Sequence, residues 1–468
     1  MTKLLNPLIL LFITFLLGSI FRFYNINFDD LWIDEIATFW IANPSFDLLT
    51  SYKNHIGFER TPYLFNYIVK VFFTVFGYNI ELARLIPVFT SIFSILIIAK
   101  ISRSISKNSE YFLSAFIISF NIFLISYSQE LRVYSTQFFF ISLSLFYFIK
   151  LDDFKNLINY SLFFLFTQIS MFLHPFSLIL LFSYFTLFVL DFIKKEKLNF
   201  KLIFLNIVIL IISAIYYGYH SYLSMDVPTW ITQPNLKFYT NFYFSKFFGS
   251  RIMGLFFLIT LLLLIIKFYK QIIKNKVLTL LTIFIIYSYF FPLFYGYIFQ
   301  PIILPRYITF VLIPIILLIS NLTFKLKYTY KYILVSAIVI FTLLNFVTEE
   351  TFRQFFTDRK VYKPEFNRTL NIIENSNEKN LLLLLNPAEQ KLESSWEKST
   401  LNYLEYLKQK KSYSISFINK NKSEHQTYWI LCIYDLNQNI CKLKNNLSIN
   451  NEIFLNRGKL ILVEKISQ

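Results

Sequence analysis

The sequence predicts an all-α polytopic membrane protein that carries a small C-terminal α/β domain. Hydrophobic residues make up 56% and aromatic residues 20% of its 468 residues, and the mean hydropathy is +0.52. These values are well above those of soluble proteins of this length. The apolar runs end near residue 347, and residues 348–468 are richer in Asn, Lys and Glu. We therefore divide the chain into a membrane domain, 1–347, and a C-terminal domain, 348–468.

About eleven transmembrane helices are predicted, because one crossing needs roughly 20 apolar residues. The first run is too long for a cleavable signal peptide and has no small-residue cleavage site. The eleven runs are 4–24, 85–101, 111–127, 138–149, 157–173, 176–192, 202–222, 252–268, 277–298, 308–322 and 332–347.

Basic residues orient these runs, because Lys and Arg collect on the cytoplasmic side of a membrane. Clusters follow the second, sixth, eighth and tenth runs, and Lys3 precedes the first. The bias toward Ile, Lys, Asn, Phe and Tyr over Gly, Ala and Arg indicates an AT-rich, bacterial genome. The expected location is therefore the plasma (inner) membrane. The first outer loop, about 25–83, and the C-terminal domain are expected on the extracytoplasmic side.

Residues 61–77 are apolar but are not counted as a crossing, because a crossing there would invert every later run. The stretch is short, begins near Pro62, carries Lys70 and ends at Gly77. We expect an interfacial helix in the outer leaflet. The alternative is a protein with twelve spans and a cytoplasmic tail.

The C-terminal domain shows short apolar runs that are typical of buried strands, at 381–385, 428–434 and 460–463. Apolar residues at helical spacing in 399–410 predict a helix between the first two strands. Cys432 and Cys441 are the two cysteines of the chain. In an oxidising compartment they could form a disulfide, but a buried free pair remains an equal alternative.

Polar side chains gather at the predicted outer ends of the runs, starting with the acid pair Asp34 and Glu35. Ionisable groups are costly near a bilayer and usually mark a functional site. Arginines beside carboxylates fit an anionic ligand, with the arginines holding a phosphate and a carboxylate deprotonating a hydroxyl. The group comprises Asp34, Glu35, His55, Glu59, Arg60, Arg84, Gln129, Glu130, Arg132, Tyr134, His174, Arg306 and Tyr307.

The charge and motif pattern excludes two other ligand classes. The net charge of +17 comes from lysines and arginines between the apolar runs, so it does not indicate nucleic-acid binding. No glycine-rich phosphate loop is present, which argues against a nucleotide donor. A lipid-linked phosphate donor satisfies both observations.

Six short segments carry a family resemblance, which covers roughly residues 1–320. The sequence resembles the GT-C fold membrane glycosyltransferases, in the branch that contains the protein O-mannosyltransferases and the aminoarabinose transferases of lipid A. The segments are, in order, LWIDEIATFW, FERTPYLFNYIV, ARLIPVFTSIFSILI, SYSQELRVYS, FLHPF and LPRYITFVLIP.

The resemblance implies an inverting glycosyltransferase, hexosyl or pentosyl, that uses a polyprenyl-phosphate-linked sugar and a lipid, glycan or protein acceptor in the cell envelope. By this likeness Asp34 is the general base, Glu35 supports it, and Arg60 binds the donor phosphate. Many relatives have two prolines where this chain has Thr61 and Pro62. The remaining expected phosphate ligands are Arg84, Arg132 and Arg306, and the expected cavity residues are His55, Glu59, Gln129, Tyr134, His174 and Tyr307.

Each assignment has a simpler alternative. The Asp34-Glu35 pair fits a helix N-terminus, which favours acids, and terminal arginines commonly extend to the headgroups as anchors. His174 fits a structural histidine. His55 and Glu59 share helical spacing, but two ligands make a weak metal site. No cofactor is expected, and a divalent metal is left open.

Other functions remain open at this stage. A membrane transporter or lipid flippase for an anionic lipid-linked substrate would also place charges in a cavity, although such proteins show internal repeats that this sequence lacks. An inactive scaffold would tolerate replacement of Asp34. A polysaccharide polymerase or ligase with a lipid-diphosphate donor would place its active residues in a late loop.

Overall fold

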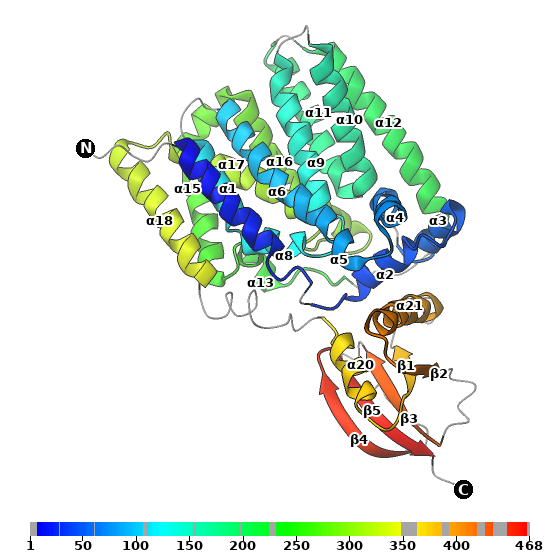
Figure 1. Ribbon diagram of the computed structural model, residues 1–468. Coiled ribbons are helices and arrows are strands. Elements are labelled where there is room, and N and C mark those ends of the chain that lie inside the picture. Colours follow the sequence, from blue (N-terminus) through cyan, green and yellow to red (C-terminus); the bar gives the residue numbers. More distant parts are fainter. Residues whose placement is uncertain are drawn as a thin grey trace. The chain divides into compact units, whose positions relative to one another are not determined.

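The computed structural model resolves two compact units (Figure 1). Unit 1 comprises Met1–Tyr24, Arg60–Phe65 and Arg84–Phe356, and unit 2 comprises Asn25–Glu59, Asn66–Ala83 and Thr357–Gln468. Most of the first outer loop therefore groups with the C-terminal domain rather than with the helices that flank it in sequence. The structure describes residues 7–27, 29–59, 61–105, 110–152, 156–196, 198–223, 231–347, 363–385, 393–418, 426–433 and 447–465.

Unit 1 is a bundle of long apolar helices. All twelve residues of α17 are buried, so this helix forms the centre of the bundle. The long helices are α1 (Pro7–Phe23), α6 (Leu85–Ile105), α7 (Glu110–Ser119), α8 (Ile122–Ser128), α9 (Tyr134–Ile149), α10 (Leu157–Leu173), α11 (Leu178–Ile193), α12 (Phe200–Leu223), α15 (Arg251–Lys274), α16 (Lys276–Ile298), α17 (Leu312–Thr323) and α18 (Tyr328–Val347). Short turns are η1 (Lys150–Asp152), α13 (Leu236–Tyr239), α14 (Phe244–Phe247), η2 (Pro175–Ser177) and η3 (Thr309–Val311).

In its described residues each of the eleven predicted runs is mostly helical, as expected of a multi-pass membrane protein. Among the described residues, six helices are long and apolar enough to cross a membrane by themselves. A seventh crossing arises if α7 and α8, which meet at a 60° bend, form one span. Asn121 lies at this bend, where its side chain accepts from Leu124 N (2.9 Å) as the N-cap of α8 and donates to Phe247 O (2.9 Å). The predicted count of eleven is not confirmed.

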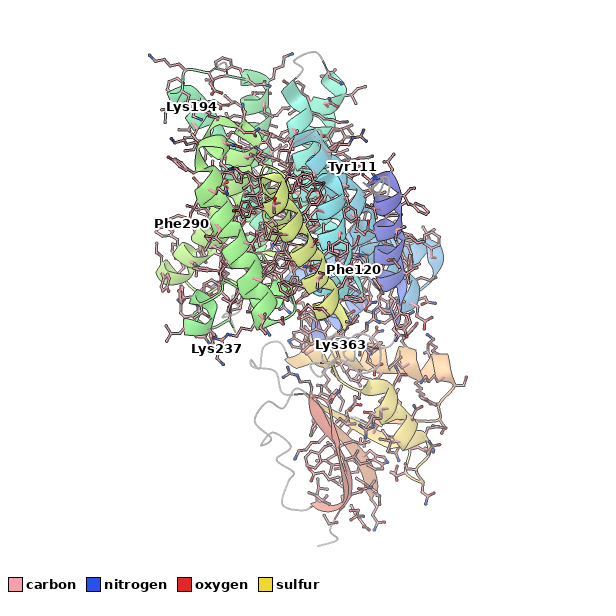
Figure 2. The ribbon with its side chains drawn as sticks, turned by 90° about the vertical axis from the view of Figure 1, so that its left-hand side faces the viewer. Tyr111, Phe120, Lys194, Lys237, Phe290 and Lys363 are labelled. Carbon is pink, nitrogen blue, oxygen red and sulfur yellow. The ribbon has the colours of Figure 1, made fainter. Side chains whose placement is uncertain are left out.

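Two of the basic clusters meet at one end of the bundle. At one end Lys194 Nζ donates to Ile273 O (3.0 Å), and Lys276 forms a 2.5 Å ion pair with Asp191. These contacts bring the C-terminal end of α11 and the junction of α15 with α16 together. Lys194 and Lys237 lie at opposite ends of unit 1 (Figure 2). The basic clusters after the sixth and eighth runs thus share one end, as the orientation argument requires.

Unit 2 contains the helices that follow α1 and a five-stranded sheet. Helix α4 ends before Gly77, whose φ of +88° needs a glycine. At 13 residues it is about 20 Å long, shorter than the roughly 30 Å hydrocarbon core. The elements are α2 (Ile33–Ile41), α3 (Leu48–Ile56), α4 (Leu64–Phe76), α5 (Ile80–Ala83), α20 (Phe366–Glu374), β1 (Asn380–Leu385), α21 (Glu393–Lys411), β2 (Ser416–Ile418), β3 (Thr427–Ile433), β4 (Leu447–Leu455) and β5 (Gly458–Lys465).

The sheet has the strand order β2-β1-β3-β5-β4. Strand β1 pairs in parallel with β2 and β3, whereas β5 pairs antiparallel with β3 and β4. The three predicted strands correspond to β1, β3 and β5, and the predicted helix lies within α21. Cys432 lies in β3 and is not a free thiol, while Cys441 lies outside the described residues.

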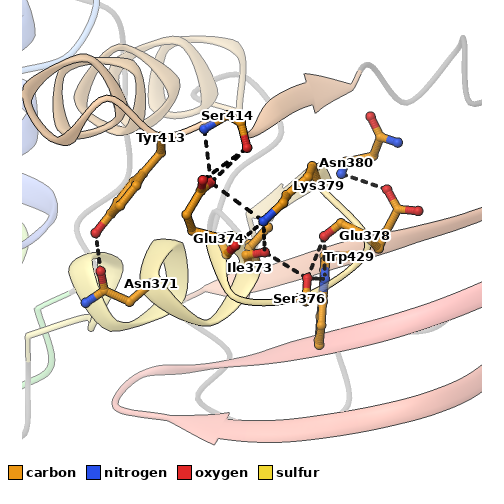
Figure 3. A network of polar contacts seen from close by, with 10 residues as sticks. All are labelled: Asn371, Ile373, Glu374, Ser376, Glu378, Lys379, Asn380, Tyr413, Ser414 and Trp429. Atoms are coloured by element: carbon orange, nitrogen blue, oxygen red, sulfur yellow. Dashed lines mark hydrogen bonds and ion pairs between the residues drawn. The ribbon is translucent and has the colours of Figure 1, made fainter.

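A polar network joins α20 to the sheet (Figure 3). Trp429 Nε1 in β3 donates to Ser376 Oγ (3.0 Å) and Glu378 O (3.1 Å). Glu374 at the end of α20 accepts from Ser414 N (3.0 Å), and Lys379 donates to the backbone carbonyl of the same glutamate. The Lys379 bond satisfies one of the last carbonyls of α20, and the other bonds link the end of this helix to β3 and to the segment before β2.

Candidate functional site

Helix α2 carries the predicted catalytic pair in its first turn. Glu35 Oε2 accepts from Trp32 N (3.3 Å), so the third helical residue caps the helix start. Asp34 is half-buried, and Glu35 is fully buried. Two acids in a first turn also interact favourably with the positive, N-terminal end of the helix dipole. Glu35 therefore has the helix-capping role that was the simpler alternative for the acid pair. Asp34 lies in the same first turn of α2.

Glu35 has a second partner that the sequence analysis missed. Its Oε2 forms a 2.8 Å ion pair with Lys363 Nζ, and the two side chains are 0% and 2% exposed. Removing a carboxylate and an ammonium from water is costly, and only close pairing offsets this cost. Because Lys363 lies shortly before α20, which begins at Phe366, the pair connects the start of α2 to the C-terminal domain.

Asp30 also connects the segment before α2 to the C-terminal helices within unit 2. Its carboxylate accepts from Asn367 N in α20 (3.0 Å) and from Tyr403 OH in α21 (3.4 Å). The Tyr403 hydroxyl accepts in turn from Leu31 N (3.3 Å). The segment that leads into α2 is thus held by both C-terminal helices, which restricts where Asp34 can move.

His55 and Glu59 lie near the end of α3. His55 is fully buried, and its Nδ1 lies 2.9 Å from Asn66 Nδ2. An amide nitrogen only donates, so Nδ1 is the acceptor and the ring proton sits on Nε2. Glu59 is half-buried, and its backbone N–H donates to His55 O (2.8 Å). Arg60 lies outside the described residues.

In unit 1 three aromatic candidates form one cluster. The rings of Tyr134, His174 and Tyr307 have centroid separations of 5.3–6.3 Å. The Arg306 guanidinium lies 5.4 Å from the centre of the Tyr307 ring, within cation–π range. His174 Nδ1 accepts from Phe176 N (3.2 Å), so the histidine also caps a turn. The structure thus brings together four residues from three segments that are distant in sequence.

The remaining candidates of unit 1 precede α6 and α9. Arg84 is 2% and Arg132 is 6% exposed, and Glu130 beside it is 1% exposed. The Gln129 amide donates to Tyr24 O (2.6 Å) and, more weakly, to Phe21 O (3.3 Å). It therefore caps the end of α1, which is a structural role.

Arg22 is a buried cation that the sequence analysis did not single out. Its guanidinium donates to Ser91 Oγ (2.7 Å), Gly18 O (2.8 Å) and Ile118 O (3.0 Å). Oxygens on α1, α6 and α7 thus accept the hydrogen bonds of the Arg22 guanidinium, and this side chain connects the three helices.

The predicted site residues fall into two groups. Unit 2 holds Asp34, Glu35, His55 and Glu59, and unit 1 holds Arg84, Gln129, Arg132, Tyr134, His174, Arg306 and Tyr307. Within the described part of the chain no three His, Cys, Asp or Glu side chains are grouped as metal ligands. The chemistry available is a half-buried carboxylate at the start of α2 in unit 2 and, in unit 1, the buried arginines Arg84 and Arg132 together with the half-buried Arg306 beside Tyr307.

The sequence matches no protein-family model and no curated protein. Solved structures do match. The chain is similar to apo ArnT from Cupriavidus metallidurans, with a TM-score of 0.61 and 9% identity over 97% of both chains. The structure of ArnT bound to undecaprenyl phosphate matches with a TM-score of 0.54 and 8% identity, again over 97% of both chains.

A second protein shares the architecture. The apo oligosaccharyltransferase of Archaeoglobus fulgidus matches with a TM-score of 0.53 and 10% identity, over 92% of this chain and 70% of that chain. At such low identities the likeness concerns the fold.

Proposed function

Because this chain has the fold of the GT-C membrane glycosyltransferases, we propose that it transfers a sugar from a polyprenyl-phosphate-linked donor to a cell-envelope acceptor. The observation that carries the proposal is the presence of Arg84 and Arg132, both buried, just before α6 and α9 in the helical bundle. Ionisable residues inside a membrane protein are costly and commonly belong to a functional site, and arginine suits a phosphate ligand. Support comes from ArnT of Cupriavidus metallidurans, which matches over 97% of its length and was solved bound to undecaprenyl phosphate.

The proposed reaction is a single inverting displacement. The Asp34 carboxylate takes the proton of an acceptor hydroxyl, whose oxygen attacks the anomeric carbon of the sugar. The bond from that carbon to the donor phosphate breaks, and its electron pair leaves with the polyprenyl phosphate. Arginines stabilise the charge that develops on this phosphate, and the sugar emerges with inverted configuration.

The candidate residues divide between these steps. Arg60, Arg84, Arg132 and Arg306 are proposed to hold the donor phosphate. His55, Glu59, Tyr134, His174 and Tyr307 are proposed to line the substrate cavity, and Glu35 is proposed to hold α2 in place through Lys363. The sugar, hexosyl or pentosyl, would be transferred on the extracytoplasmic side of the inner membrane.

A transfer assay with the whole chain tests this proposal. Membranes that contain the wild-type chain, and matched membranes without it, receive radiolabelled polyprenyl-phosphate sugars and are then separated into lipid, glycan and protein fractions. The proposal expects label in one fraction only when the chain is present, with an inverted anomeric centre. Retained configuration would contradict the mechanism, and absence of transfer from every donor would contradict the function.

A further inference from the structure

A cavity of about 530 Å³ opens in unit 1 beside the segment that connects α12 to α15. Its walls come from residues 231–251 and from Ile303 and Leu304. Tyr243 OH donates to Ile303 O (3.2 Å), and Gln233 Nε2 donates to Gly296 O (2.6 Å). The connecting segment is thereby bonded to α16 and to the segment that follows it, so the walls of the cavity are held in place.

The cavity lining is cationic. Lys237, Lys246 and Arg251 line it, all three side chains are exposed, and its described lining contains no carboxylate. The sequence has no Asp or Glu at all between Asp226 and Glu349. Helix α15 begins at Arg251, and the positive end of its dipole adds to the positive potential of these side chains. Three cations, with no carboxylate in the part of the lining that the structure describes, favour an anionic ligand.

These cations lie at the end of the bundle that does not hold the lysine clusters. Arg251 begins α15 and Lys274 ends it, and a helix of 24 residues separates them by about 36 Å. Lys237 and Lys194 also lie at opposite ends (Figure 2). The bias that places lysines at the Lys274 end therefore does not account for Lys237, Lys246 and Arg251.

The lining is also partly apolar. Ile231, Pro234, Phe238, Ile303 and Leu304 contribute hydrophobic surface beside the cations, and Asn235 and Asn241 contribute amides. A small inorganic anion would leave the apolar surface wet, whereas a phosphate attached to a hydrocarbon chain would cover it. We propose that this cavity binds the phosphate group of a lipid headgroup, as a site separate from Arg84, Arg132 and Arg306. The inference rests on the proposed function only for the choice of lipid probe.

Photolabelling of the full chain tests the proposal. The purified protein in phosphatidylcholine nanodiscs receives farnesyl phosphate that carries a diazirine, and mass spectrometry locates the labelled peptides. The variant combines Lys237→Gln, Lys246→Gln and Arg251→Gln. The matched control is Lys274→Gln, at the other end of α15. Thermal unfolding of both variants verifies that they are folded.

We expect label in peptides from 231–251 or 303–304, at least about tenfold reduced in the triple variant and unchanged in the control, because each charge-assisted phosphate contact contributes strongly. Unlabelled farnesyl phosphate should compete and farnesol should not. Equal labelling of a folded triple variant, or equal competition by farnesol, would overturn the proposal. Competition by inorganic phosphate as strong as that by farnesyl phosphate would contradict a lipid ligand and indicate a free anion.

The assay measures binding without transfer, so the two proposals fail separately. If no donor gives sugar transfer, the proposed function fails while the labelling result stands. If transfer depends on Asp34 but no label reaches these peptides, the cavity proposal alone fails.

Discussion

Glu35 and Lys363 form a 2.8 Å ion pair although 328 positions separate them in the chain. Both side chains are almost fully excluded from solvent. Glu35 follows the proposed base Asp34 directly, and Lys363 precedes α20, which the polar network of Figure 3 joins to the sheet. The C-terminal domain thus holds the helix that carries the proposed base.

Replacement of Lys363 by Met should destabilise unit 2 strongly. It leaves the Glu35 carboxylate buried without its cation, and breaking a buried pair in this way costs about 3–5 kcal/mol. We expect a lower midpoint of thermal unfolding for the purified chain and faster protease cleavage in unit 2.

Two further variants check this explanation. Lys459→Met removes a more exposed pair with Glu452 (2.9 Å) and should cost only about 0–1 kcal/mol. The double variant Glu35→Leu with Lys363→Met removes both charges and should regain much of the lost stability. A Lys363→Met protein as stable as the Lys459→Met protein would disprove the role of the pair.

Tyr403→Phe should loosen the segment that leads into α2. The hydroxyl donates to Asp30 and accepts from Leu31 N, and a buried polar group that loses its partner costs about 1–3 kcal/mol. Amide hydrogen exchange at Leu31 should become faster. Tyr413→Phe removes an exposed hydroxyl that bonds to Asn371 and serves as the control, in which exchange at Leu31 should not change.

Asp47 should make the start of α3 sensitive to acid. Hydrogen bonds from the Thr50 side chain and from Thr50 N (3.0 Å) lower the pKa of its carboxyl below the ordinary value. A lowered folded-state pKa stabilises the helix above the unfolded-state pKa of about 4, and this contribution is lost as the pH falls through the folded-state value. Hydrogen exchange at the Thr50 amide should accelerate below about pH 4, and much less so in Asp47→Asn, which caps without titrating. Equal acid sensitivity in both proteins would contradict this origin.

Arg132→Gln and Arg306→Gln should weaken donor binding. Each substitution removes a cation proposed to hold the donor phosphate, so the KM for the polyprenyl-phosphate sugar should rise by about tenfold or more. Arg103→Gln, an exposed arginine near the end of α6, serves as the control and should leave the KM unchanged. A fall in kcat without a change in KM would instead indicate that the arginines do not bind the ground-state donor.

The helices could be predicted well because long apolar runs have few structural alternatives in a membrane protein. Strands β1, β3 and β5 were also predictable, since each contains a continuous apolar run. Strand β2 has three residues, and β4 reads LSINNEIFL with its central residues exposed, so neither has the pattern of a buried strand. Local pattern therefore identified the interior of the sheet and missed its edges.

The candidate site was only partly predictable. The aromatic cluster of Tyr134, His174 and Tyr307 involves residues that were identified by their places at the ends of apolar runs. Lys363 could not be identified, because nothing in its own segment distinguishes it from other lysines of the C-terminal domain. The pairing of Lys363 with Glu35 depends on tertiary structure, which a local pattern does not encode. The structural role of Gln129 as a cap for α1 was missed for the same reason.

The most direct test of the central claim compares Asp34→Asn with Asp47→Asn in the transfer assay. Both substitutions remove one carboxylate from the same loop and keep the shape of the side chain. Because general-base catalysis contributes roughly 10²–10⁴-fold, the rate of sugar transfer should fall at least about 100-fold in Asp34→Asn and remain near wild type in Asp47→Asn. Equal transfer by the wild-type and Asp34→Asn proteins would show that Asp34 is not the base and would contradict the proposed mechanism.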